Sequence, residues 1–391
     1  MSAPAELVLV ANARLPSARA QSLQVMQAAA AFARAGVQTT LVHARRSPLP
    51  ELAGVDLFTH YAVPAGPRPE IVAAACVDFI DRVPTRLQYL PARLQELSFA
   101  RRAARFVERE RPAALVLARE AECARHLVRR GRRGVFLEIH RVPGGGTRRR
   151  WLAEAAAGAA GVVAISGGVA EDLACFGLSG ARLRVEHDAL DPGRFAALPA
   201  RAEARARLGL EGGGPLVVYT GGLMEWKGVD VLVDAARLLP RVRFAIAGGH
   251  AGDVERLRRR AEGLANVRID GFRPPGEVPL YLAAGDVAVV PNRSQPAIAA
   301  RYTSPLKVFE AMAAGIPLVV SDLPALREIL SDEQAVFVAP DDPQALAAGL
   351  GRLVGDEELR LRLAGHLRAG ASGISWDARA RRILDWMGEL C

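Results

Sequence analysis

The middle of the chain decides the fold, because an apolar strand, a glycine-containing turn and an amphipathic helix follow one another there without interruption. The stretch reads Leu216-Val217-Val218-Tyr219-Thr220-Gly221-Gly222-Leu223-Met224-Glu225-Trp226-Lys227-Gly228, and the helix is expected over 229–239. Glycines let the backbone approach a phosphate closely, the start of a helix offers unpaired N–H groups, and a lysine adds a positive charge. The stretch therefore predicts a strand-turn-helix unit that binds a diphosphate. It contains neither the GxGxxG fingerprint of dinucleotide sites nor a Walker P-loop.

Apolar strands and helical segments alternate on both sides of this unit. A helix is expected over 21–34, ended by Gly36, between the first two strands. The expected strands lie over 7–11, 39–43, 114–118, 135–139 and 161–165, and then over 216–219, 243–247, 267–269, 286–290, 317–321 and 335–338. Such alternation indicates parallel sheets covered by helices on both faces. It predicts an α/β fold with doubly wound domains, whose ligands bind beyond the carboxyl ends of the strands.

The length of the chain and its turn-forming residues predict two domains. A chain of 391 residues is too long for one ordinary core, and the segment 188–199 places turn formers between the two series of strands. We therefore expect domains over 1–194 and 195–370, with the ligand site in a cleft between them.

The composition favours a globular protein with an anionic partner. Half of the residues are apolar and 24% are charged, and no apolar stretch reaches the length of a membrane span. The first twelve residues lack the pattern of a secretory signal, so we expect a cytoplasmic protein. The net charge of +9 indicates attraction to a sugar nucleotide, a membrane surface or nucleic acid, but only 5% of the residues are aromatic and no reader motif is present, which disfavours nucleic acid. The cysteines lack CxxC spacing and predict neither a zinc site nor a disulfide framework: Cys76, Cys123, Cys175 and Cys391.

Arginine dominates the basic residues. Of the 51 lysines and arginines, only Lys227 and Lys307 are lysines. Each marks either a site that needs a compact ammonium or a chance survivor of the bias. Residues 82–111 carry eight arginines against three glutamates. This segment predicts either a solvated helix face or a basic surface for an anionic membrane or a phosphorylated acceptor.

A second segment rich in polar residues follows the fourth strand of the second series. It reads Arg301-Tyr302-Thr303-Ser304-Pro305-Leu306-Lys307-Val308-Phe309-Glu310-Ala311-Met312-Ala313-Ala314-Gly315. Thr303 or Ser304 is expected to cap a helix whose first turn contains Pro305, which would leave N–H groups for an anion. Glu310 lies on an apolar stretch of this helix, where a carboxylate suits the vicinal hydroxyls of a ribose. The alternative for Glu310 is an ion pair with Lys307, one turn earlier.

These two segments resemble the retaining glycosyltransferases of family 4, the group 1 type, and the resemblance extends over nearly the whole chain. It is strongest in 219–222 with 227–230 and in 304–317, and weaker in 164–166, in Asp191 with Phe195, and in 375–377. The resemblance implies the GT-B fold, in which two Rossmann-like domains face each other across a cleft. The N-terminal domain would be the acceptor side, the C-terminal domain would bind the nucleotide-sugar donor, and the last segment, 371–391, would return to the N-terminal domain.

The resemblance also implies roles for individual residues. Lys227 would contact the donor diphosphate, Glu310 would bind the ribose, and backbone groups near Ser304 would hold phosphate or sugar. His140 matches a histidine that reaches the transferred sugar; its alternative is a packed, hydrogen-bonded residue at a strand end. The expected donor-binding residues are Gly221, Gly222, Lys227, Phe272, Arg273, Tyr302, Thr303, Ser304, Pro305, Leu306 and Glu310. The expected catalytic residues are Lys227, His140 and Arg301.

Two positions depart from the family pattern. Many members have an arginine after the first glycine of the phosphate motif, where this chain has Gly222, and many have a second glutamate at the position of Tyr302. A subset with the Ser-Pro-Leu-Lys signature tolerates the change at Tyr302. We expect Arg301 to supply the missing phosphate charge.

The activity implied by the resemblance is transfer of a sugar from a UDP- or GDP-linked donor to a hydroxyl acceptor, with retained anomeric configuration, by a hexosyltransferase-type enzyme of glycan biosynthesis. The acceptor would be a glycan, a lipid-linked molecule or a small molecule. We expect neither a metal nor another cofactor, because Lys227, Arg301 and helix N-termini would stabilise the leaving diphosphate and no DxD-type cluster is placed to hold a cation. The alternatives are a catalytically silent partner subunit that binds nucleotide sugar, and a GT-B sugar-nucleotide epimerase or phosphorylase. The enzyme is expected in the cytoplasm, and on the inner face of the membrane if the arginine-rich segment binds anionic lipid.

Overall fold

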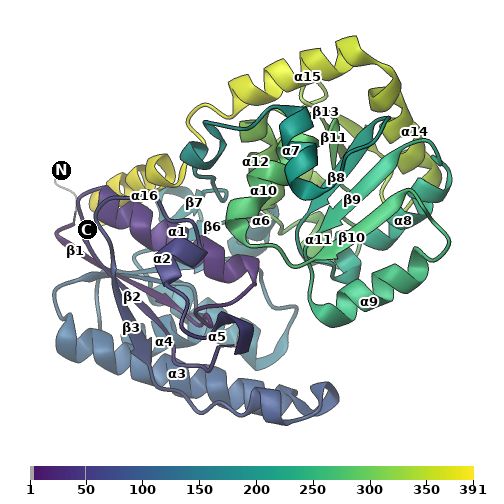
Figure 1. Cartoon of the computed structure of the whole chain (residues 1–391). Helices are drawn as coiled ribbons and strands as arrows, with labels where there is room; N and C mark the ends of the chain where they lie inside the picture. The colour runs from purple at the N-terminus through teal and green to yellow at the C-terminus, as the bar shows by residue number, and fades with distance from the viewer. Residues whose placement is uncertain (1–3, 49) are drawn as a thin grey trace. The chain divides into compact units, whose positions relative to one another are not determined.

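The computed structural model describes residues 4–48 and 50–391, which divide into two compact units. Unit 1 comprises Met1–His187 together with Trp376–Cys391, and unit 2 comprises Asp188–Ser375. In each unit, helices cover both faces of a parallel sheet (Figure 1). The predicted α/β fold with two Rossmann-like, doubly wound domains is confirmed.

The described residues of unit 1 form a seven-stranded sheet with the order β3-β2-β1-β4-β5-β6-β7. All neighbouring strands are parallel. The strands are β1 (Glu6–Ala11), β2 (Gln38–Ala44), β3 (Glu70–Ala74), β4 (Leu115–Ala118), β5 (Val135–Ile139), β6 (Gly161–Ala164) and β7 (Leu183–Val185). The central strands are continuous apolar runs because helices bury both of their faces.

Two groups of helices cover the sheet of unit 1. On one face, α1 (Ala20–Arg34) packs against the last helix, α16 (Trp376–Leu390), and Arg34 pairs with Asp377 across this contact at 2.5 Å. On the other face, α3 (Tyr89–Glu110), α4 (Ala121–Arg129) and α5 (Gly146–Gly158) lie side by side (Figure 1). The remaining α-helices are α2 (Leu57–His60) and α6 (Gly167–Ala174).

Unit 2 has a six-stranded parallel sheet among its described residues, with the order β10-β9-β8-β11-β12-β13. The strands are β8 (Leu216–Thr220), β9 (Arg243–Ala247), β10 (Val267–Gly271), β11 (Val287–Val290), β12 (Leu318–Ser321) and β13 (Ala335–Val338). Alternate residues of β8 point to opposite faces, so Val217 and Tyr219 enter one apolar core while Leu216 and Val218 enter the other.

The helices of unit 2 complete these two cores. On one face, α8 (Val229–Arg237), α9 (Ala251–Arg260) and α14 (Pro343–Gly355) contribute apolar residues, and on the other face α10 (Val278–Ala284) and α12 (Leu306–Ala314) do so. The others are α7 (Arg201–Leu208), α11 (Ala297–Ala300), α13 (Pro324–Arg327) and α15 (Glu357–Gly370). Because the strands are parallel and adjacent, the carboxyl ends of β8, β9, β10 and β11 lie along one edge of the sheet. The segments 220–228 and 301–310 follow strands of this group.

The eleven expected strands are present, with bounds that shift by one or two residues at most, but β3 and β7 were not expected. Both lie at the edges of the sheet of unit 1 and are only partly buried. Glu70 begins β3 and Arg184 lies in the middle of β7. Edge strands carry charged residues and need no long apolar run, so an apolar pattern does not predict them.

The units divide at other positions than the sequence predicted. The predicted boundary after residue 194 lies within unit 2, because Leu190 and Phe195 pack in the core that contains Val308 and Phe309 of α12. The turn formers of this segment instead build η5 (Pro192–Phe195), a short 3₁₀ helix capped by Asp191, whose Oδ1 accepts from Gly193 N at 3.0 Å. Likewise, 371–375 belongs to unit 2 and α16 to unit 1, since Ala371 and Ile374 pack against the same core.

Candidate functional site

Glycines join the carboxyl ends of three neighbouring strands in unit 2. Gly221 N, after β8, donates to Ala247 O at 2.9 Å, and Gly248 N, after β9, donates to Gly271 O at the end of β10 at 2.6 Å. A Cβ on Gly248 would lie 2.0 Å from Gly221 O, so a side chain cannot be accommodated at position 248. The edge of the sheet is therefore built from backbone at this point, and a ligand can approach the main chain closely.

The turn that follows Gly221 carries Lys227 into this edge. It contains η6 (Glu225–Lys227), and Gly228, with φ of +67°, begins α8. A Cβ on Gly228 would lie 1.7 Å from Pro291 O, which requires glycine there. Arg293, after β11, holds the turn: its backbone N donates to Trp226 O at 3.1 Å, its Nε donates to Glu225 O at 3.2 Å, and its guanidinium pairs with Asp230.

The positive charge of Lys227 is not balanced by a nearby carboxylate of the described residues. Its Nζ lies 3.9 Å from the centroid of the Trp226 ring, and burial lowers the pKa of its ammonium to about 8. No carboxylate among the described residues forms an ion pair with it. A partly desolvated ammonium beside a backbone-lined edge attracts a phosphate.

Lys307 also reaches this edge, although the family resemblance implies no donor contact for it. It lies in the first turn of α12, and its Nζ lies 3.8 Å from the centroid of the Tyr219 ring. The signal that could have identified it is compositional, since it is one of only two lysines in the chain.

The start of α12 differs from the prediction. Neither Thr303 nor Ser304 caps the helix; Pro305 is the N-cap residue, without a side-chain cap bond from the described residues. Ser304 Oγ instead accepts from Asp188 N at 2.8 Å, and Thr303 is buried. Ser304 thus fastens the first residue of unit 2 to the loop before α12, which explains why a residue of capping type stands there without capping. The helix start offers its N–H groups without competition from a side-chain cap.

Glu310 lies on the next turns of α12 and is 8% exposed. Its Oε1 lies 3.4 Å from Nη1 of Arg194, which comes from η5 and also donates to Pro275 O. The ion pair with Lys307, which the sequence left open as an alternative, is not formed; Arg194 takes that place. Arg194 was not expected near the site, because the predicted boundary put it in the other domain.

The other expected donor-binding residues lie in loops of unit 2. Phe272 follows β10 and is 38% exposed. Arg273 lies 3.9 Å from both Asp270 and Glu277. Arg301 follows α11, with its guanidinium 5.8 Å from the ring centroid of Tyr302.

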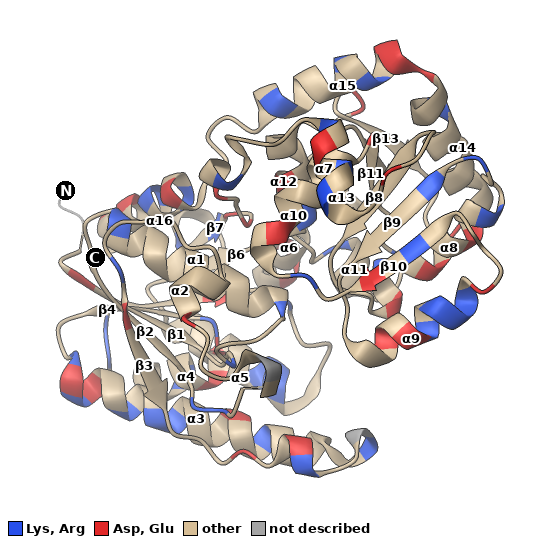
Figure 2. Ribbon diagram, viewed as in Figure 1, with Lys and Arg blue, Asp and Glu red and all other residues tan. Residues whose placement is uncertain are grey.

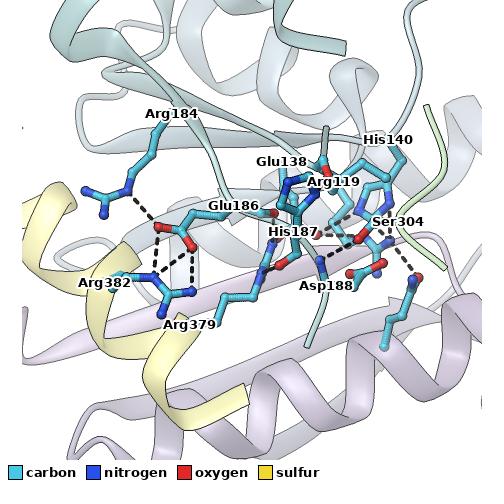
Figure 3. Close-up of polar contacts among 12 residues, drawn as sticks. Arg119, Glu138, His140, Arg184, Glu186, His187, Asp188, Ser304, Arg379 and Arg382 are labelled. Carbon is cyan, nitrogen blue, oxygen red and sulfur yellow. Dashed lines mark hydrogen bonds and ion pairs between the residues drawn. The ribbon is translucent and has the colours of Figure 1, made fainter. Parts of the chain in front are cut away.

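His140 lies in unit 1, after β5, within a buried charged cluster (Figure 3). Its Nε2 lies 2.8 Å from Glu138 Oε1 and 2.7 Å from Arg119 Nη2, so protein groups engage the ring. Burial, and then Arg119, lower the pKa of His140 to about 4 against the effect of Glu138. At neutral pH the ring is therefore uncharged: one of its nitrogens can donate and the other can accept a hydrogen bond, but it cannot act as a protonated general acid.

Glu138 joins the final helix to this cluster. Its Oε2 lies 2.9 Å from Nη2 of Arg379, a residue of α16 that is 1% exposed (Figure 3). Although burial alone raises it, the pKa of Glu138 is held well below its usual range by Arg379, His140 and Arg119. The carboxylate therefore fixes Arg119 and His140 in place and fastens α16 to the sheet. This pairing could not be predicted from local sequence patterns, because the two residues are 241 positions apart.

The described residues contain no group of three or more His, Cys, Asp or Glu side chains arranged to hold a metal ion. Within the same residues, none of the helices combines the length and the apolar character needed to cross a bilayer. The arginine-rich segment forms η2 (Ile80–Arg82), η3 (Thr85–Leu87) and α3, with basic residues along much of the helix (Figure 2).

Comparison with known proteins adds a family and a fold. Residues 214–356, all in unit 2, match the family model of the Glycosyl transferases group 1. The D-inositol 3-phosphate glycosyltransferase of Xylanimonas cellulosilytica is 36% identical over 197 residues, which are 48% of this chain and 45% of that protein. The match therefore spans less than half the length of this relative.

Solved structures resemble the chain over nearly its whole length. Sucrose-phosphate synthase from Thermosynechococcus elongatus has a TM-score of 0.78 with 18% identity, covering 98% of both chains. HepE from Anabaena, solved in complex with UDP-glucose, has a TM-score of 0.75 with 16% identity, covering 98% of this chain and 99% of that one. At these identities the likeness shows the fold.

Proposed function

We propose that the chain, which matches the group 1 glycosyltransferases over residues 214–356 and has the GT-B fold, transfers a sugar from a nucleoside diphosphate to an acceptor hydroxyl with retained anomeric configuration. The observation that carries the proposal is that Lys307, in the first turn of α12, lies close both to Lys227 and to Gly221 at the glycine-lined strand ends of unit 2. Helix N-termini, lysine ammonium groups and glycine turns each favour an anion, and together they suit a diphosphate.

The donor would extend along this edge of unit 2. Its diphosphate would meet Lys227 and the backbone between Gly221 and Gly222, its ribose would meet Glu310, and its base would lie near Phe272 and Arg273. We propose a UDP- or GDP-linked hexose. Uridine donors are the first to test, because HepE was solved with UDP-glucose.

Leaving-group stabilisation would be the main catalytic contribution of this arrangement. As the bond between the anomeric carbon and the diphosphate oxygen breaks, negative charge grows on the diphosphate, and preorganised cations and N–H groups stabilise it. Lys227, the start of α12 and Arg301 would supply these groups, so we propose that the reaction needs no metal. His140, neutral and oriented by Arg119 and Glu138, would hydrogen-bond the transferred sugar.

The acceptor side of the proposal rests on unit 1. A cavity of about 430 Å³ lies at the start of α5, where Arg149 and Arg150 stand beside Gly146 and Phe176. The curated relatives are named for inositol 3-phosphate, and we propose a small polyol that carries a phosphate as the first acceptor class to test. Transfer to inositol 3-phosphate, but not to inositol, would support this assignment.

Peripheral contact with a membrane belongs to the same proposal. Near the start of α3, Leu87, Tyr89 and Leu90 are 60%, 69% and 69% exposed, and Arg82 and Arg86 are exposed beside them. Exposed apolar side chains next to arginines suit the interface of an anionic bilayer. We propose that the protein works in the cytoplasm, with this surface on the inner face of the membrane.

The experiment that tests the function is a thermal-shift panel of nucleotide sugars, followed by donor turnover without acceptor. Stabilisation by one nucleotide sugar together with slow donor hydrolysis would support an enzyme. Stabilisation without any hydrolysis or transfer would favour the silent partner subunit, and interconversion of the donor sugar would favour an epimerase. An absence of stabilisation by every UDP- and GDP-linked sugar would contradict the donor site.

A further inference from the structure

Lys307 inverts the usual arrangement of a lysine side chain. Lysines commonly bury their aliphatic stem and keep the ammonium in water. Here the residue is partly exposed, yet its Nζ is buried and makes no hydrogen bond within the part of the chain that the structure describes. A buried ammonium without a partner loses its hydration and gains no compensation, which is costly. The position therefore needs an explanation that a packing role does not give.

The surroundings of the Lys307 ammonium offer aromatic carbon and backbone but no paired carboxylate. Nζ lies over the face of Tyr219, whose own hydroxyl donates to Gly222 O at 2.6 Å. A Cβ on Gly221 would lie 3.1 Å from Nζ, so the absence of a side chain at position 221 is what makes room for the ammonium. Lys307 thus reaches the glycine turn from α12, while Lys227 reaches it from the other end of the same turn.

The charged groups around Lys307 favour binding of an anion beside its Nζ. Lys227, from η6, is close enough to repel the ammonium, and Glu310, on the same helix as Lys307, attracts it but is paired with Arg194 of η5. The titratable group that β8 contributes is Tyr219, which is uncharged at neutral pH. Two neighbouring cations without a paired carboxylate leave a local excess of positive charge, which a bound anion would neutralise.

We propose that Lys307 is a second cation that binds the diphosphate of the donor, and that the phosphate oxygens complete the coordination that the protein leaves open at its Nζ. The inference rests on the proposed function, because it places the donor diphosphate at the glycine turn of unit 2. It adds a binding residue on α12 to Lys227 of η6. The contact of Nζ with the face of Tyr219 holds the amino group in position before the ligand arrives, and it becomes a cation–π contact when the group takes up its proton.

Proton uptake should accompany binding if this assignment is correct. Burial, and then Lys227, lower the pKa of Lys307 well below its usual value, and burial lowers that of Lys227 to about 8. A diphosphate stabilises both charged forms and raises both pKa values. Above the pKa values of the free protein, binding therefore takes up protons, and affinity falls as the pH rises further. At pH 8 a phosphomonoester is already fully ionised, so the uptake comes from the protein.

The test is calorimetric titration of the full-length protein with UDP, GDP and uridine at pH 8, in two buffers with different ionisation enthalpies. For the wild type we expect UDP or GDP binding with proton uptake, to which Lys227 also contributes because burial lowers its pKa to about 8. Lys307→Met should weaken diphosphate binding about ten- to hundredfold, leave uridine binding unchanged and reduce the uptake. Lys307→Arg should bind UDP with less uptake, because a guanidinium stays protonated. Arg207→Met, which removes an exposed charge on α7, is the matched control and should behave as the wild type.

Each outcome separates the two proposals. If the wild type binds neither UDP nor GDP, the proposed function fails. If the wild type binds UDP but Lys307→Met keeps its affinity and its proton uptake, or loses UDP and uridine binding equally, the role of Lys307 at the diphosphate is overturned while the donor site stands. Thermal unfolding of each variant verifies that it is folded, and Lys307→Arg keeps the test decisive if the methionine variant is not.

Discussion

Substitution of Glu310 by glutamine tests the ribose assignment most directly. The side chain is 8% exposed, and its carboxylate faces Arg194 at 3.4 Å. Glutamine keeps the shape but replaces a charged acceptor by a neutral amide. Hydrogen bonds to charged groups contribute about 1.5–3 kcal/mol, so UDP or GDP should bind about 10- to 150-fold more weakly to Glu310→Gln. The loss of the ion pair with Arg194 should lower the free energy of unfolding, but the fold should remain because the amide oxygen of glutamine can still accept from Arg194.

A double-mutant cycle with 2′-deoxy-UDP isolates the contact between Glu310 and the ribose. The wild type should distinguish UDP from 2′-deoxy-UDP, and Glu310→Gln should lose at least about 1 kcal/mol of that discrimination, as expected for groups in contact. Arg194→Met is the control, because it removes the ion pair but leaves the carboxylate, and it should still discriminate. Equal discrimination by the wild type and Glu310→Gln in calorimetric titrations would refute the ribose assignment, whatever the loss in overall affinity.

The remaining predictions concern charge at other places. Activity should survive excess EDTA, and loss of turnover that magnesium or manganese restores would show that a metal supplies the positive charge. Binding to anionic vesicles should fall steeply as the salt concentration rises, and it should weaken in Leu90→Ser. Leu361→Ser, which changes an equally exposed leucine on α15, is the control and should bind as the wild type. Equal cosedimentation with neutral and anionic vesicles would contradict a membrane-binding surface. The pKa of His140 is lowered to about 4, so below pH 6.5 the unfolded chain binds more protons than the folded one. The free energy of unfolding, measured with urea, should therefore fall from pH 6.5 towards 4.5 by at most about 3 kcal/mol, and it should fall less in His140→Gln. Lys227→Arg should lower kcat strongly despite its conserved charge, and a near-wild-type kcat in steady-state kinetics would show that a guanidinium fits the turn.

The central strands of both sheets could be predicted because their physics is local. A strand such as β8 is buried on both faces, and its sequence must therefore be continuously apolar. β3 and β7 were not predicted, because an edge strand pairs with one neighbouring strand and tolerates a charged residue such as Glu70 or Arg184. The domain boundary was predicted wrongly for another reason. The Asp-Pro-Gly turn after Leu190 could form either between two domains or inside one, and only the packing of Phe195 on α12 assigns it to unit 2.

The candidate site was predictable where one segment carries all of it and not where distant segments meet. The glycine turn with Lys227 and the helix with Glu310 are each continuous in sequence, and both lie at the predicted edge of the sheet. The pairing of Glu310 with Arg194 and the contact of Lys307 with Tyr219 join residues 116 and 88 positions apart, the latter from 307 minus 219. Local spacing favoured a pair between Glu310 and Lys307, but the tertiary fold brings a guanidinium to the carboxylate and turns the lysine towards the glycine turn.

The compositional bias acquires a physical reason from this geometry. Arginines that lie inside the protein have fixed partners: Arg379 meets Glu138, Arg293 meets Asp230, and Arg194 meets Glu310. A guanidinium cannot shed its proton, so burial without a partner would carry the full cost of a desolvated charge. An ammonium can lose its proton while the site is empty and regain it when an anion arrives, which limits that cost to the pKa shift. In a chain that otherwise uses arginine, the two lysines, 227 and 307, stand where no carboxylate of the described residues forms an ion pair with the ammonium, and we propose that the ligand supplies the partner.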